Sequence, residues 1–101
     1  MKATLRFQRK VTLVHGRSAE VAVAEVKVWD VPLSPHYPEG LKYSLFLVAK
    51  ADGRVIVGFD NHKPKGPHLH HEGKELLYEF RGVDALIEDF WRWVEKEGFV
   101  L

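Results

Sequence analysis

The sequence predicts an α+β fold: an antiparallel sheet of four or five strands with one C-terminal helix packed on one face. Three observations lead to this prediction. Apolar residues alternate with polar ones near the N-terminus, a strong hairpin signal lies at Asp52-Gly53, and apolar residues recur at helical spacing over residues 83–97. With 101 residues, 46% of them apolar and 29% charged, residues 1–101 are expected to form one globular domain.

The N-terminal part of the chain is predicted to form a β-hairpin. The first strand covers residues 4–14, because apolar side chains occupy alternate positions there: Leu5, Phe7, Val11 and Leu13. Residues 15–18 supply a turn, and residues 19–31 form the second strand, in which a change of apolar phase indicates a bulge. Residues 32–40 contain three prolines and are therefore expected to form a loop.

Residues 41–50 and 54–59 are predicted to pair as a second hairpin around Asp52-Gly53. A two-residue turn there would pair Phe46 with Phe59, and this face is expected to form the core under the helix. Val48, Val55 and Val57 would lie on that same face. The opposite face would carry Tyr43, Leu45, Leu47, Ile56, Gly58 and Asp60, and the glycine would allow another group to approach closely.

Residues 76–80 are expected to form one more short strand, followed by a helix over residues 83–97. The helix prediction depends on a stripe of apolar residues: Val83, Leu86, Ile87, Phe90 and Val94. Gly98 is the expected helix stop. Trp91 and Trp93 flank the stripe, which favours a place at the core edge or in a homodimer contact.

Composition limits the classes of function. The net charge of +1 neither requires nor excludes a polyanionic partner, and the absence of cysteine excludes thiolate zinc sites and cysteine nucleophiles. The first residues lack the apolar stretch of a signal peptide, and no apolar run approaches the ~20 residues that span a bilayer. We therefore expect a cytoplasmic protein with no membrane partner.

The segment from Asp60 to Glu75 holds four of the six histidines and is predicted to be a functional loop. Three interpretations remain open. In the first, His68 and His70 act as general acid and base in RNA cleavage, and cations contact the phosphate: Lys63, Lys65 and Arg54. In the second, His68, His70 and Asp60 bind a divalent metal ion. In the third, the histidines are solvated loop residues with no common role.

Motifs spread over most of the chain resemble a known family. They are Val28-Trp29-Asp30-Val31-Pro32, Ser34-Pro35-His36, Lys42-Tyr43-Ser44-Leu45, Asp52-Gly53-Arg54, Phe59-Asp60-Asn61, Lys65-Gly66-Pro67-His68-Leu69-His70, Tyr78-Glu79-Phe80 and Asp89-Phe90-Trp91. Together they resemble the TumE-like family of prokaryotic toxin–antitoxin systems. The resemblance implies a small toxin encoded beside a helix-turn-helix-type antitoxin, with RNA as its target. By motif match, it implies functional roles for Asp60, Asn61, His68 and His70.

The sequence thus favours a toxin that cleaves RNA, with His68 and His70 as the acid/base pair and Asp60 orienting one imidazole. Substrate contacts are expected from Asn61, Lys63, Lys65, His71, Tyr43 and Arg54. No cofactor is expected to be required, and a divalent metal ion bound at this segment would be dispensable. The alternatives are a non-catalytic module that binds nucleic acid or the antitoxin, and a His/Asp metal-binding protein.

Overall fold

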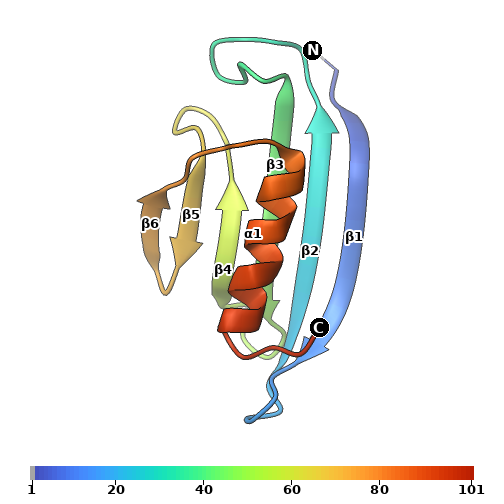
Figure 1. Ribbon diagram of the computed structural model, residues 1–101, viewed down its shortest axis with the longest axis vertical. Helices are drawn as coiled ribbons and strands as arrows, with labels where there is room; N and C mark the ends of the chain where they lie inside the picture. The colour runs from blue at the N-terminus through green and yellow to red at the C-terminus, as the bar shows by residue number, and fades with distance from the viewer. Residues whose placement is uncertain (1) are drawn as a thin grey trace.

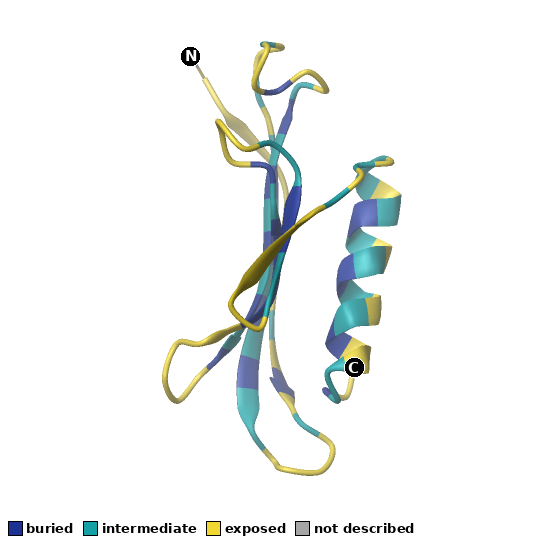
Figure 2. Ribbon diagram, turned by 90° about the vertical axis from the view of Figure 1, so that its left-hand side faces the viewer, coloured by how far each residue is buried: buried dark blue, intermediate teal, exposed yellow. Residues whose placement is uncertain are grey.

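The computed structural model describes residues 2–101, which form a six-stranded antiparallel sheet with one helix on one face (Figures 1 and 2). The spatial order of the strands follows the chain, so each strand pairs with the next. The elements are β1 (Thr4–Val14), β2 (Val21–Asp30), β3 (Leu41–Ala49), β4 (Val55–Asp60), β5 (His68–His71), β6 (Lys74–Leu77) and α1 (Val83–Lys96). The predicted α+β architecture with a C-terminal helix is confirmed, but the sheet has six strands rather than four or five.

The larger strand count comes from the histidine-rich segment, which was predicted to be a loop. Residues 68–71 pair with β4, and a two-residue turn at Glu72 and Gly73 leads directly into β6. Both turn residues have positive φ, 51° and 76°, as a tight hairpin turn requires. Histidine, glutamate and lysine are weak strand formers, so the local sequence does not predict a strand here. Pairing with β4 stabilises it.

The pairing of β3 with β4 is shifted by one residue from the predicted register. Leu45 pairs with Phe59, and Phe46 pairs with Gly58. The connection between the strands is longer than a two-residue turn, because the Gly53 amide donates a hydrogen bond to the Ala49 carbonyl at 2.9 Å. The register also shifts once inside the hairpin, between Leu47 and Val48 of β3.

This shift places Phe46 on the face opposite the core, so the prediction that Phe46 and Phe59 share a buried face is wrong. Moving a strand by one residue exchanges its two faces, because side chains alternate along it. The core side of β3 is instead formed by Tyr43, Leu45 and Leu47, which were expected on the open side. Gly58 and Asp60 lie on the open face, as predicted.

The helix packs over the buried side of the sheet and encloses the core. Its Leu86, Phe90 and Val94 are fully buried, and the Phe90 ring meets Phe59 of β4 edge to face at 6.3 Å. Gly98, at φ 93°, lies just beyond the helix and ends it, as expected. The two tryptophans pack at the margin of the core.

In β2 no change of apolar phase occurs. Its buried residues keep one phase because alanines continue the pattern of the valines: Ala22, Ala24, Val26 and Val28. The irregularity lies in β1, between Leu5 and Phe7. The predicted bulge in the second strand is therefore wrong, since small alanines were left out of the apolar pattern.

Candidate functional site

Strand pairing on the open face brings one carboxylate and two imidazoles together. Asp60 of β4 pairs directly with His68 of β5, and His70 follows two residues later on the same face. The His68 Nε2 atom lies 3.0 Å from Asp60 Oδ1, and the His70 Nε2 atom lies 3.4 Å from Asp60 Oδ2. One carboxylate therefore bridges both rings, whose centroids are 4.6 Å apart.

His68 is the inner member of this cluster, with only 9% of its side chain exposed. Its Nδ1 atom lies 2.7 Å from the carbonyl oxygen of Gly66, which can only accept a hydrogen bond. Nδ1 therefore carries a hydrogen, and Nε2 is the nitrogen that faces Asp60. Because the ring is enclosed, His68 is poorly placed to contact a substrate directly.

His70 is the outer member, with 25% of its side chain exposed. Its second nitrogen, Nδ1, lies 3.9 Å from a carboxylate oxygen of Glu75 on β6. The Phe46 ring lies beside it at a centroid distance of 5.6 Å. That ring also lies across Gly58, where a Cβ atom would come within 2.3 Å of it. The close approach predicted at Gly58 is thus made by Phe46.

A groove on the open face reaches the outer part of the cluster. It is lined by Phe46, Arg54, Val55, Asp60, His70, His71, Gly73 and Glu75. His68 does not line it. The titratable groups that line the groove are therefore two carboxylates, two imidazoles and one guanidinium: Asp60, Glu75, His70, His71 and Arg54.

Of the cations predicted for substrate binding, Arg54 lines the groove and Lys65 pairs with Glu75, which also lines it. Arg54 contacts Glu20 at 2.9 Å and Asp52 at 3.4 Å, and Lys65 Nζ lies 2.8 Å from Glu75. The pKa of the Glu75 carboxyl is lowered, mainly because Lys65 donates a hydrogen bond to it. Exposed pairs of this kind contribute little stability, so a phosphate could replace any of these three carboxylates.

Lys63 is exposed, and its backbone amide lies 3.4 Å from the Tyr37 hydroxyl.

Two further residues predicted to contact substrate, Asn61 and Tyr43, belong to the packing of the sheet rather than to the groove. The buried Asn61 side chain accepts a hydrogen bond from the Tyr43 amide at 2.9 Å and donates one to the Leu41 carbonyl at 2.8 Å. The Tyr43 ring lies in the core, stacked on Phe80 at 5.5 Å.

His71 points away from the other two histidines of β5. Although it borders the groove, its Nε2 atom lies 3.1 Å from Glu97 and its ring lies 4.7 Å from Trp93 at the end of the helix.

The sequence did not predict Phe46 and Glu75 as members of the site. A signal for Phe46 existed, because a glycine facing an aromatic residue across a sheet leaves room for the ring.

Two groups of side chains have the composition of metal ligands. Their donor atoms lie within 4.8 Å of one another: Asp60, His68 and His70 on the open face, and His71, Glu72 and Glu97 near the end of the helix. The first group is more enclosed than the second, because Glu72 of the second group is exposed.

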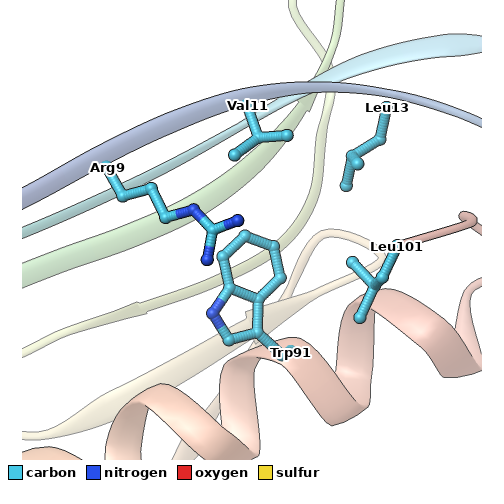
Figure 3. A pocket seen from close by; sticks show the side chains of 5 residues that line it. All are labelled: Arg9, Val11, Leu13, Trp91 and Leu101. Carbon is cyan, nitrogen blue, oxygen red and sulfur yellow. The ribbon is translucent and has the colours of Figure 1, made fainter.

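A separate hollow lies between β1 and the helix (Figure 3). It is lined mainly by apolar side chains, and the Arg9 guanidinium lies 5.4 Å above the Trp91 ring. Among the residues lining it, Arg9 alone is charged, and none is a general base. The carboxylate and imidazoles of the open face are therefore the better candidate for chemistry.

Fold and site define a small α+β protein that carries a carboxylate–imidazole cluster beside a groove on the open face of its sheet. The family to which the chain belongs is the TumE toxin family, whose sequence model, described as "Toxin TumE", matches residues 3–97. The chain is accordingly a toxin component of a toxin–antitoxin system, and this implies an antitoxin partner. No curated protein and no solved structure matches the sequence. Within residues 2–101, no helix is long and apolar enough to cross a membrane.

Proposed function

We propose that this toxin cleaves RNA by proton transfer at Asp60 and His70. The observation that carries the proposal is that these two side chains and Arg54 line one groove. A carboxylate and an imidazole can serve as base and acid, and a guanidinium can hold the phosphate beside them. RNA is the substrate class that the family resemblance implies, and phosphodiester cleavage needs no chemistry beyond these groups.

The proposal changes one role expected from the sequence. His68 is enclosed and does not line the groove, whereas His70 does. We therefore assign His70 and Asp60 to the substrate and treat His68 as a positioning residue that fixes the Asp60 carboxylate.

In this reaction Asp60 accepts the proton of a 2′-hydroxyl, and the resulting oxygen attacks the neighbouring phosphorus atom. The bond from phosphorus to the 5′-oxygen breaks, and His70 gives its proton to that oxygen. The products are a 2′,3′-cyclic phosphate and a 5′-hydroxyl, so the proton count balances. Arg54 would neutralise charge on the phosphate, and the Phe46 ring would offer a stacking surface for a base.

The test compares RNA cleavage by the wild type with cleavage by His70→Ala and Asp60→Asn, all in the presence of a chelator. Loss of a general acid or base should lower the rate ~10²–10⁴-fold. The stability of His70→Ala should change by less than ~1 kcal/mol, because the ring is partly exposed. His71→Ala is the matched control, since it removes the neighbouring imidazole, which contacts the helix end rather than Asp60. It should retain near wild-type cleavage.

Equal cleavage by the wild type and His70→Ala, at unchanged stability, would refute the acid/base assignment. If the wild type instead binds RNA without cleaving it, the protein is the binding module considered above. Arg54 and Phe46 would then hold RNA or a helix-turn-helix-type antitoxin in the same groove. Binding of both molecules should in that case weaken in Arg54→Ala.

A further inference from the structure

The cluster of Asp60, His68 and His70 has the donor atoms and the spacing of a metal centre. We propose that these three residues form a binding site for one divalent transition-metal ion of the Zn²⁺, Co²⁺ and Ni²⁺ class. The site uses Nε2 of each histidine and the carboxylate of Asp60. Its existence does not depend on the proposed RNA cleavage.

The distances between the donor atoms fit a shared ion. Atoms bound to one ion at about 2.0–2.1 Å lie roughly 2.9–3.4 Å apart in tetrahedral or octahedral geometry. The two imidazole nitrogens lie 3.0 and 3.4 Å from the oxygens of Asp60. All three donor atoms lie within 4.8 Å of one another. Small side-chain rotations would therefore bring all three onto one ion.

The hydrogen bonding of His68 leaves its Nε2 atom available to an ion. Its Nδ1 hydrogen is donated to the Gly66 carbonyl, so in the neutral ring the free lone pair is on Nε2, which lies 3.0 Å from Asp60 Oδ1. A backbone carbonyl bonded to the outer ring nitrogen is also the usual arrangement behind a metal-ligating histidine.

The outer half of the site has a charged neighbour. The Glu75 carboxylate lies 3.9 Å from the outer nitrogen of His70 and 2.8 Å from Lys65 Nζ. The Phe46 ring flanks the imidazole. Because the ligands come from two paired strands, the sheet sets their positions before an ion arrives. Coordination positions that these three ligands leave open would face the groove.

The ligand types select the class of ion. Two neutral imidazoles and one carboxylate suit zinc, cobalt and nickel, whereas magnesium and calcium favour all-oxygen sites. The chain has no cysteine, so thiolate ligands for softer ions such as Cu(I) are absent. We therefore expect Zn²⁺, Co²⁺ and Ni²⁺ to bind, and Mg²⁺ to bind far more weakly.

The test is calorimetric titration of the full, tag-free chain with Zn²⁺ and Co²⁺ in the absence of RNA. We expect one ion per chain with micromolar or tighter affinity, and an absorption band from Co²⁺ coordinated by nitrogen. His70→Ala and Asp60→Asn should each weaken binding at least about 100-fold while circular dichroism shows an unchanged fold. Using these two variants avoids reliance on the enclosed His68, whose loss could disturb folding.

His71→Ala is the matched control, because it lies on the same strand and belongs to the other His/Glu group. It should bind the ion as the wild type does. The proposal is overturned if the wild type binds neither ion below millimolar concentration. It is also overturned if His70→Ala and Asp60→Asn keep the affinity while His71→Ala loses it. Neither result bears on RNA cleavage, which is measured in chelator.

Discussion

On the helix-covered face of the sheet, Leu45 and Phe59 lie fully buried beneath Phe90, whereas the opposite face carries Asp60 and His70 in a groove. The first face consists of apolar contacts and accounts for most of the burial. The second consists of polar contacts between side chains that water can reach. Stability and chemistry should therefore respond to different substitutions, and a variant on one face should leave the property of the other largely intact.

The largest effect on stability is expected from Phe90→Ala. The ring is fully buried and contacts both Phe59 and Trp91, so its removal leaves a cavity in the core. Loss of a buried phenylalanine ring typically lowers the free energy of unfolding by ~3–5 kcal/mol. Urea denaturation would measure the loss. Molecules that remain folded should still bind Co²⁺ with wild-type affinity, and a weakened site at full folding would contradict the separation of the two faces.

Gly58→Ala should affect both stability and the site from within the open face. The new methyl group would come within 2.3 Å of the Phe46 ring, which must then move away from His70. Because Phe46 is only partly buried, we expect a moderate loss of stability, ~1–3 kcal/mol, comparable to overpacking. The larger change should be in the affinity of the site for Co²⁺.

The double variant Gly58→Ala/Phe46→Ala provides the control, since removing the ring removes the clash. It should recover stability relative to Gly58→Ala alone. A double variant less stable than either single variant would show that the ring does not cause the strain.

A smaller effect on stability is expected at alkaline pH, from two tyrosines on the helix-covered face of the sheet. Burial, followed by its hydrogen bond to Asp89, raises the pKa of Tyr78 to about 12, and burial raises the pKa of Tyr43 well above its usual range. Unfolded tyrosine titrates near ~10, so the unfolded state releases these protons first. The contribution of these two tyrosines to stability should therefore be constant below about pH 10 and fall as the pH rises towards 12.

Unfolding free energies of the wild type and Tyr78→Phe, compared between pH 7 and pH 11, would measure this effect. The advantage of the wild type should shrink as the pH rises, because the phenol contributes only while it is protonated. If the stability advantage of the wild type over Tyr78→Phe grew with pH, the expected direction of the effect would be wrong.

Two parts of the fold could be read from local sequence. The helix follows from the stripe through Leu86, Phe90 and Val94, because the stripe has the period of an α-helix and Gly98 stands at its end. The first hairpin follows from alternating residues on either side of a polar turn. In the helix the apolar stripe is also the buried side, whereas Leu5 and Phe7 of the alternating set in β1 remain exposed.

The register of β3 with β4 could not be read in this way. Both sides of β3 are rich in apolar residues, with Leu45 and Leu47 on one side and Phe46 and Val48 on the other, so alternation does not identify the buried side. Asp52-Gly53 is compatible with a two-residue turn and also with a longer loop that ends at a glycine of positive φ. Packing under the helix, rather than the turn, selects between them.

For the site, the sequence alone determined that His68 and His70 share one face if their segment is extended, because they are two residues apart. It also placed Asp60 at the end of the neighbouring strand. Only the tertiary structure decided that residues 68–71 form a strand. It also decided that His68 is enclosed while His70 lines the groove, and that Tyr43 belongs to the core. These outcomes depend on which strand pairs with which and on the turn at Gly66, and contacts between residues distant in the chain are not encoded in local periodicity.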